Sequence, residues 1–348
     1  MQRKQVLRKL AFLGLIGLIG ASAALTLTSL ALPQVRAQDP LPSWNEGPSK
    51  QAIVSFVQKV TDKSNPEYVS PADRIATFDQ DGTLWVEHPL YAQAMFALER
   101  VHELAAKLPE RRTEQPFKAV LANDREAIAR FTEQDWAKII GATHAGMTTE
   151  AFHDIAQEWL GRARDPRFKR PYTELAYQPM LEVMQYLRAN GFKTYIVTGG
   201  GQEFVRVYSE QVYGVPPEQV VGSSIATQYE YQDGKPVLMR LPKVFFIDDK
   251  TGKPMGINLF IGKRPLAAFG NSGGDREMLE YTGAGPGARL MMLVLHDDAK
   301  REYAYGPAEG LPDTKVGTFS QALRDEAKKR GWVVISMKND FKKIFAWE

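Results

Sequence analysis

The chain has 348 residues, 44% of them apolar and 24% charged, which suits one large or two ordinary globular domains. It contains no cysteine, and this excludes disulfide bonds, thiol nucleophiles and cysteine-ligated metals. The formal net charge is +3, but residues 1–37 hold five of the 44 basic residues and none of the 41 acidic ones, so the remainder carries −2. No basic stripe with interleaved aromatic residues occurs, and we expect no nucleic-acid partner.

Residues 1–37 have the pattern of a secretory signal peptide. Four basic residues lie near the start, residues 10–32 carry no charge, and Val35-Arg36-Ala37 follows where a signal peptidase would cleave. We therefore predict an exported protein, periplasmic or secreted, with no stable membrane association once the signal is removed. The alternative is an uncleaved membrane anchor, since 23 uncharged residues are long enough to span a bilayer.

Residues 38–87 are expected to begin the core domain. Apolar side chains recur at helical spacing over residues 53–60, which predicts a short amphipathic helix. The apolar run 75–78 predicts a buried strand, and Asp79 and Asp81 follow it directly, with Gly82 opening a turn. Because an unpaired buried charge is unfavourable, a strand that ends in two carboxylates indicates a cation site, proton chemistry or both.

Residues 88–178 are predicted to form an all-helical insert that caps the core domain. Apolar residues recur at three- and four-residue intervals over 95–108, and the stretches 123–140 and 149–160 predict further helices. Glycine and β-branched strand runs are scarce in this region. We call this segment the insert.

Residues 179–348 return to alternating strands and helices and are predicted to complete the core. The predicted strands are 193–197, 266–269 and 290–296, with a β-hairpin over 225–246. The predicted helices are 180–190, 202–212 and 276–282, and the aromatic-rich tail 332–347 predicts a last strand and helix. Repeated strand–helix units imply an α/β fold, a Rossmann-like parallel sheet with helices on both faces.

Three strand ends bring polar residues to one edge of this predicted sheet. The first supplies two carboxylates, the second supplies Thr198 with three glycines that open a helix, and the last supplies Asn271 and Asp275. Open α/β sheets bind ligands beyond the carboxyl ends of their strands. Oxygen ligands beside backbone amides that can cradle an anion indicate a phosphate site with Mg²⁺.

The predicted chemistry follows from charge. Two unit charges about 4 Å apart interact by about 4 kcal/mol at an effective dielectric constant of about 20, so a carboxylate that attacks a phosphate dianion meets strong repulsion. A divalent cation, a lysine and helix-terminal amides can reverse that repulsion. We expect Asp79 to be the nucleophile that forms an aspartyl-phosphate. Asp81 would protonate the leaving oxygen and then accept a proton from the hydrolytic water.

These residues resemble the four motifs of the haloacid dehalogenase superfamily. The matching motifs are Asp79-x-Asp81-Gly82-Thr83, Thr198 after an apolar strand, Lys253-Pro254, and Gly270-Asn271-Ser272-x-x-Asp275. The resemblance covers about residues 71–300, and the insert resembles the first cap type of the superfamily, as in phosphoserine phosphatase relatives. It is nearest to exported bacterial phosphatase-like members, and it implies a small phosphorylated substrate.

The resemblance also implies a role for each motif residue. The Asp79 carboxylate, the Asp81 backbone carbonyl and Asn271 would face Mg²⁺, with Asp275 beside the metal or in its coordination shell. Thr198 and Gly199 would bind the phosphate, and Lys253 would bridge Asp79 and phosphate. Asn271 departs from the family pattern, because it is a neutral ligand at a position where the family has an acid.

Two assignments have alternatives. Lys263 lies eight residues before Asn271 and is the other candidate for the catalytic lysine. Glu87 is expected near the entrance beneath the insert, where it could contact a polar group of the substrate, or it could be a solvated loop acid.

Three other functions stay open. A dehalogenase would use Asp79 but would need neither Asp81 nor a metal. A phosphotransferase would pass the phosphoryl group to an acceptor alcohol. A catalytically degenerate exported binding protein is the third, and Asn271 is the residue that favours it.

Overall fold

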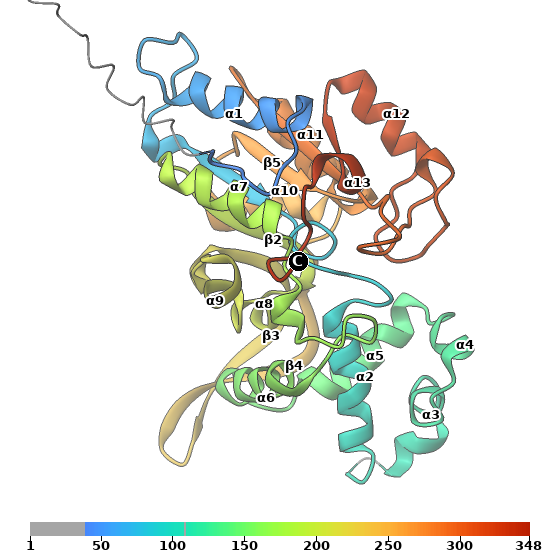
Figure 1. The fold of residues 1–348 in the computed structure, drawn as a ribbon. Coiled ribbons are helices and arrows are strands. Elements are labelled where there is room, and N and C mark those ends of the chain that lie inside the picture. Colours follow the sequence, from blue (N-terminus) through green and yellow to red (C-terminus); the bar gives the residue numbers. More distant parts are fainter. Residues whose placement is uncertain (1–38, 108) are drawn as a thin grey trace, which may run out of the picture. The chain divides into compact units, whose positions relative to one another are not determined.

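A seven-stranded sheet runs through the part of the chain that the computed structural model describes, residues 39–107 and 109–348 (Figure 1). The predicted signal peptide lies outside the described residues. The strands are β1 (Ile75–Phe78), β2 (Lys193–Gly201), β3 (Val220–Gln232), β4 (Lys235–Phe246), β5 (Ala267–Gly270), β6 (Leu290–Leu295) and β7 (Val333–Ser336). Their order is β4-β3-β2-β1-β5-β6-β7, and every neighbouring pair is parallel except β3 and β4. The predicted Rossmann-like α/β fold is confirmed.

The central strands are buried on both faces, which explains their continuous apolar sequences. Alternate residues of one strand enter different cores: Phe269 packs in a cluster with helices α1 (Pro48–Thr61) and α7 (Gln178–Ala189). Its neighbour Ala268 packs in a second cluster with α11 (Arg276–Gly283) and α12 (Gln321–Arg330). Since successive strand residues point to opposite faces, these helices cover the two sides of the sheet.

The predicted helix 123–140 is divided at residues 129–132, and a helix over 117–121 was not predicted, but the insert between β1 and β2 does consist mainly of helices. They are α2 (Ala92–Leu104), α3 (Phe117–Leu121), α4 (Arg125–Ile128), α5 (Glu133–His144) and α6 (Thr149–Arg162). A third apolar cluster holds α2, α3 and α5 together through Val101, Phe117 and Ile139. The insert boundaries at residues 88 and 178 stay a prediction.

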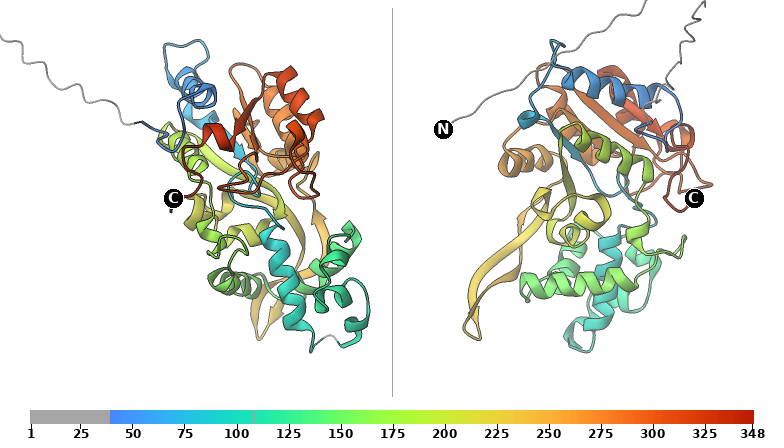
Figure 2. Two further views of the ribbon diagram at one scale, coloured as in Figure 1. Left: turned by 45° about the vertical axis from the view of Figure 1, so that its right-hand side comes forward. Right: turned by 60° about the vertical axis from the view of Figure 1, so that its left-hand side comes forward.

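The β3–β4 hairpin pairs over residues 224–246, close to the predicted 225–246, and it also contacts the insert. It leaves the sheet as a two-stranded ribbon that lies beside helices of the insert (Figure 2). The Arg240 backbone N–H donates to Met147 O over 2.9 Å, and Arg240 O accepts from Gly146 N over 2.9 Å. The Arg240 guanidinium lies 3.9 Å from the centre of the Phe152 ring. The insert is therefore helical, but a strand of the core adds to its packing.

A predicted helix of the core is also divided. Residues 202–212 form two short helices, α8 (Gln202–Arg206) and α9 (Ser209–Tyr213), because Tyr208 leaves the helical conformation with ψ of −6° and φ of −127°. The Tyr208 ring stacks on Trp85 at 4.7 Å, a contact between distant segments that helical periodicity does not predict. The tail forms β7 and the short helix α13 (Met337–Asp340), as expected. None of the helices in the described ranges is long and apolar enough to cross a membrane.

Candidate active site

The motif residues meet at the carboxyl edge of the three central strands. In the sheet, Phe78 of β1 pairs with Ile196 of β2 and with Phe269 of β5. Asp79, Thr198 and Asn271 each follow the paired residue by one or two positions, so they emerge side by side. The expected convergence of three strand ends is present.

Lys253 lies at the centre of this edge, in the first turn of α10 (Gly252–Gly256). Its Nζ donates to Asp79 Oδ1 over 2.5 Å, to Asp275 Oδ1 over 2.6 Å and to Val197 O over 3.0 Å, and the residue is only 2% exposed. Lys263 is instead half exposed and pairs with Asp73 over 2.7 Å. The structure therefore brings Lys253, and not Lys263, to the expected nucleophile.

The Asp79–Lys253–Asp275 triad has one more acid than base. Burial lowers the pKa of Lys253, but the carboxylates of Asp275 and Asp79 raise it further, so its net pKa is above the ordinary value and the amine stays charged. Burial and then the Asp275 charge raise the pKa of Asp79, which Lys253 only partly offsets. Because two buried carboxylates share one lysine, a second cation at this place would stabilise the carboxylate that is left unbalanced.

Asp81 is held by an indole. Its Oδ1 accepts from Trp85 Nε1 over 2.7 Å, and Trp85 is fully buried. Burial raises the pKa of the Asp81 carboxyl to about 6, against the lowering effects of the Trp85 hydrogen bond and the Lys253 charge. The sequence analysis did not predict this contact.

Thr198 and the glycines after it form a backbone loop beside Asp81. The Gly200 N–H donates to Thr198 Oγ1 over 3.0 Å, and a Cβ at Gly200 would lie 3.7 Å from Asp81 Oδ2. The Gly201 N–H donates over 2.7 Å to Oε1 of Gln93, a residue of α2 in the insert. Gln93 carries no sequence signal of its own, and it links the insert to the predicted phosphate loop.

Both carboxylate oxygens of Asp275 accept hydrogen bonds from other residues of the protein. Oδ1 accepts from Lys253, and Oδ2 accepts from the backbone N–H of Asn271 over 2.9 Å and of Ser272 over 3.0 Å. Gly270 permits this arrangement, since a Cβ there would lie 2.4 Å from Asp275 Cβ. The predicted place of Asp275 in or beside a metal's coordination shell stays a prediction.

Glu87 is not a solvated loop acid, so that alternative is wrong. The residue is 2% exposed, and its Oε1 accepts from Asn271 Nδ2 and from Tyr305 Oη, each over 2.7 Å. A contact between Glu87 and the substrate stays a prediction. Tyr305 was missed, because 218 residues separate it from Glu87 and nothing local indicates the contact.

A further pair of acids lies beside the site. Asp248 is fully buried, neither of its carboxylate oxygens has a hydrogen-bond partner among the described residues, and burial raises its pKa to about 7. Asp249 faces the phosphate loop, since a Cβ at Gly199 would lie 3.6 Å from its Cβ. The two acids stand a few residues before Lys253, a signal that sequence reasoning did not use.

The residues present suit a magnesium ion of the expected kind. In residues 39–107 and 109–348 no group of three or more His, Asp or Glu side chains could hold a metal. The predicted ligands are instead one carboxylate and two neutral oxygens, from Asp79, the Asp81 carbonyl and Asn271. The Asp81 carbonyl accepts no hydrogen bond from the described residues. The Asp81 carbonyl oxygen and the unbalanced carboxylate beside Lys253 are oxygen ligands of the kind that a hard divalent cation such as Mg²⁺ prefers.

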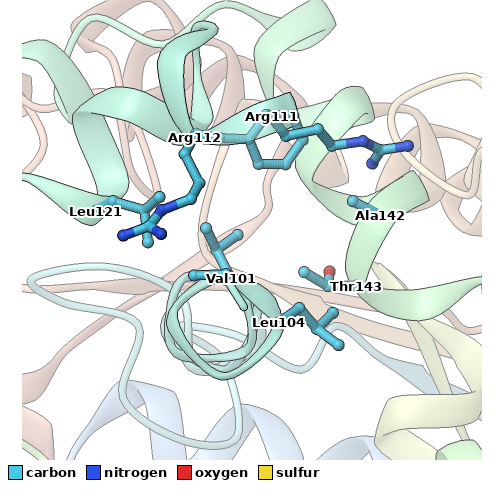
Figure 3. A pocket seen from close by; sticks show the side chains of 9 residues that line it. Val101, Leu104, Arg111, Arg112, Leu121, Ala142 and Thr143 are labelled. Atoms are coloured by element: carbon cyan, nitrogen blue, oxygen red, sulfur yellow. The ribbon is translucent and has the colours of Figure 1, made fainter. Parts of the chain in front are cut away.

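The insert contains a small hollow of its own, away from these residues (Figure 3). It is lined by Val101, Leu104, Phe117, Leu121 and Ala142, with Arg111 and Arg112 at its side. None of the motif residues reaches it. The candidate site is therefore the sheet edge and not this hollow.

Comparisons with known proteins agree with the fold. The family model described as haloacid dehalogenase-like hydrolase matches residues 76–280, which include all the motif residues. A search among curated proteins finds no match.

Several solved structures are similar at low identity. A conserved, functionally unknown protein from Anaerococcus prevotii DSM 20548 is 16% identical, with 75% of this chain and 89% of that chain covered and a TM-score of 0.50. A protein of unknown function from Bordetella pertussis Tohama I is 20% identical, with 76% and 98% covered and a TM-score of 0.44. A phosphoserine phosphohydrolase-like protein from Francisella tularensis is 16% identical, with 64% and 88% covered and a TM-score of 0.36. The Anaerococcus likeness supports the fold alone.

Proposed function

Because the chain belongs to the haloacid dehalogenase-like hydrolase family, we propose that it is a magnesium-dependent phosphomonoesterase that acts on a small phosphorylated substrate through an aspartyl-phosphate on Asp79. The proposal rests mainly on the position of Lys253 at the carboxyl edge of the sheet. Its Nζ lies 2.5 Å from Asp79 Oδ1 and 2.6 Å from Asp275 Oδ1. A buried lysine on a buried carboxylate provides the positive charge that the approach of a phosphate dianion requires.

The first step transfers the phosphoryl group to the protein. A carboxylate oxygen of Asp79 attacks phosphorus, the bond between phosphorus and the ester oxygen breaks, and Asp81 gives its proton to the departing oxygen. Lys253, Thr198 Oγ1 and the Gly199 amide would contact the phosphate oxygens, since the Gly200 and Gly201 amides donate within the protein. Because Thr198 is buried, its hydroxyl is held in place before substrate binds.

The second step releases phosphate. Asp81, now ionised, accepts a proton from a water molecule, whose oxygen attacks phosphorus and breaks the bond to Asp79. The same residue therefore acts first as an acid and then as a base. A pKa of about 6 supports both roles, since the carboxyl group is then neither fully protonated nor fully ionised near neutral pH.

Asp79, the Asp81 carbonyl and Asn271 would hold Mg²⁺, with Asp275 beside it. When bound, the ion offsets the negative charge of phosphate and carboxylates. The insert would exclude water from the site during the first step. The hydrogen bond from Gly201 to Gln93 supports this role, because it joins the insert directly to the phosphate loop.

We also propose that the protein is exported, on the pattern of residues 1–37. Expression in a bacterium with fractionation of the cells and N-terminal sequencing of the recovered protein tests this. A mature protein outside the cytoplasm that lacks residues 1–37 is expected. Recovery of an uncleaved chain from the membrane would favour the anchor.

The enzymatic proposal is tested with a chromogenic phosphate ester. The protein should release phosphate with Mg²⁺ and lose this activity in EDTA, and Asp79→Asn should be inactive with an unchanged circular dichroism spectrum. Asp62→Asn, at an exposed aspartate, is the matched control. Full activity of Asp79→Asn would refute the mechanism. Turnover that resists EDTA on a haloacid would favour a dehalogenase, and phosphate found on an added alcohol would favour a phosphotransferase. Tight ligand binding with no turnover would favour a binding protein.

A further inference from the structure

The large apolar side chains on the surface are concentrated in one stretch of the sequence. Of the ten that are exposed among the described residues, nine lie within 229–260. Single exposed apolar side chains are ordinary on a protein, whereas a group of them in one place marks an interaction site. Six of the nine, each between 51% and 71% exposed, form what we call the apolar edge: Val244, Phe245, Ile247, Met255, Leu259 and Phe260.

Two neighbouring elements carry the apolar edge. The end of β4 and the residue after it supply three of its residues, and the helical segment formed by α10 and Ile257–Ile261 supplies the other three. The ring centres of Phe246 and Phe260 are 6.0 Å apart, so the helical segment packs against the end of the strand. Met255 and Leu259 are four residues apart on this segment and therefore lie on one side of it. The six side chains belong to one surface.

The end of β4 is also an open edge of the sheet. β4 is the last strand in the sheet order, and β3 pairs with one of its two sides. The insert pairs with the other side at Met239 and Arg240. Over residues 243–247, nothing in the part of the chain that the structure describes pairs with that side. An unpaired strand with apolar side chains on both faces is a template for pairing with another strand.

We propose that the apolar edge is a dimer interface, in which two copies of this chain pair through residues 243–247 as antiparallel strands about a twofold axis. The inference goes beyond the proposed enzymatic function and does not rest on it. Pairing this edge with itself closes the assembly, because each copy covers the edge of the other and no open edge remains.

The sequence of this edge is complementary to itself. With Phe245, the middle residue of the segment, on the twofold axis, Val244 of one copy lies opposite Phe246 of the other. Lys243 is the only charged residue of the segment, and it lies opposite Ile247. The two lysines are then four residues, or about 13 Å, apart along the strands. Because this exceeds the screening length of about 8 Å at physiological ionic strength, their charges oppose the pairing only weakly.

The exposed apolar area has the size that a stable dimer needs. With about 150 Å² for the full area of each residue, the low end of the range for large side chains, the six exposed fractions amount to about 500 Å². A standard interface buries about 800 Å² on each partner, and about 65% of a homodimer interface is apolar, which is also about 500 Å². The apolar edge can therefore supply the apolar part of such an interface.

Analytical ultracentrifugation tests the proposal. The full chain is expressed in a bacterium, and the recovered protein is studied over a range of concentrations. Phe245→Asp places a charge on the proposed axis, and Tyr229→Asp places one on a similarly exposed aromatic residue nearer the hairpin turn. We expect a dimer for the wild type and for Tyr229→Asp, and a dimer at least about 100-fold weaker for Phe245→Asp, because central aromatic residues contribute most to an interface. All three should have the same circular dichroism spectrum, since both side chains are exposed.

Cross-linking tests the register. The chain has no cysteine, so Phe245→Cys contains a single thiol. Residues directly opposite each other in an antiparallel pair have Cα atoms about 4.5–5.5 Å apart, within the range that a disulfide bond spans. Mild oxidation with copper phenanthroline should therefore link most of the Phe245→Cys protein into a dimer that a reducing agent releases. Tyr229→Cys is the matched control and should stay mainly as single chains.

A wild-type protein that stays monomeric, or a dimer that Phe245→Asp does not weaken, would overturn the proposal, and so would equal cross-linking of the two cysteine variants. A monomer that binds phosphatidylglycerol vesicles, and loses this binding in Phe245→Asp, would assign the apolar edge to a membrane surface instead. Phosphate release with Mg²⁺ tests the enzymatic proposal separately, so the two proposals can fail independently.

Discussion

Replacing Lys253 by methionine should both destabilise and inactivate the protein. Methionine has a similar length and suits the buried space, but it leaves two carboxylates without the cation between them. Because Nζ lies 2.5 Å from Asp79 Oδ1 and 2.6 Å from Asp275 Oδ1, these oxygens are at most 5.1 Å apart. Two unit charges about 5 Å apart repel by about 3 kcal/mol at an effective dielectric constant of about 20. Removing one partner of a buried ion pair usually costs about 3–5 kcal/mol, which agrees with that value.

The assay is urea denaturation at pH 7.5 in EDTA, followed by far-ultraviolet circular dichroism, together with turnover of a phosphate ester. We expect Lys253→Met to lose about 3–5 kcal/mol of unfolding free energy and at least about 100-fold in turnover. The loss of stability should shrink toward pH 5, because burial raises the pKa of Asp79 and its protonation relieves the repulsion. Lys263→Met is the control, and its exposed pair with Asp73 should contribute less than about 1 kcal/mol. Wild-type stability and turnover in Lys253→Met would refute the reasoning.

Three further predictions concern single side chains. His144 is buried, and burial, Arg240 and Arg100 lower its pKa to about 3 from the ordinary 6.5. Below pH 6.5 the unfolded chain binds a proton at His144 more tightly than the folded chain does. The free energy of unfolding of the wild type should therefore fall by about 2 kcal/mol between pH 7 and pH 5 through this residue. Urea titrations of His144→Gln should not show that fall. Trp85→Phe should lower turnover about tenfold, because the indole no longer holds Asp81, which steady-state kinetics will show. Gln93→Ala should raise the KM for a phosphate ester about fivefold, since Gly201 loses its acceptor.

Matched variants at exposed positions check these three results. His153→Gln should leave the pH dependence of stability unchanged, and Trp347→Phe should leave turnover unchanged. Gln51→Ala, on the exposed face of α1, should leave KM unchanged. An equal effect in a control and in its partner would show that the predicted contact is not the cause.

Local patterns were sufficient to predict the site's framework. The apolar run before Asp79 and the glycines after Thr198 can be recognised from adjacent residues in the sequence. In any parallel sheet the carboxyl ends of the strands lie at one edge, so the motifs that follow these strands meet there. The sheet and the convergence of motif residues were therefore predictable. The spacing of the two lysines from Asn271 did not show which of them contacts Asp79. That depends on where helix α10, which follows β4, begins.

Contacts between distant segments were not predictable from one sequence. From the sequence, Glu87 was either a substrate contact or a solvated loop acid, but Tyr305 and Gly317, more than 200 residues away, enclose it. The break between α8 and α9 has a similar origin, because Tyr208 leaves the helix to stack on Trp85. Helical periodicity describes one segment at a time, and tertiary packing decided both of these cases.

The β3–β4 hairpin limits how the insert can move. It begins as a strand of the core sheet, and Arg240 then pairs with the backbone of residues 146–147 in the insert. Its register shifts near Ser224 and Ile225 interrupt the ladder between these two attachments. A ribbon fastened at both ends can flex where its pairing is irregular but cannot lengthen. The insert is therefore tied to the core sheet by this ribbon as well as by the chain on either side of it, so it cannot move away from the sheet without breaking the Arg240 backbone hydrogen bonds or bending the ribbon.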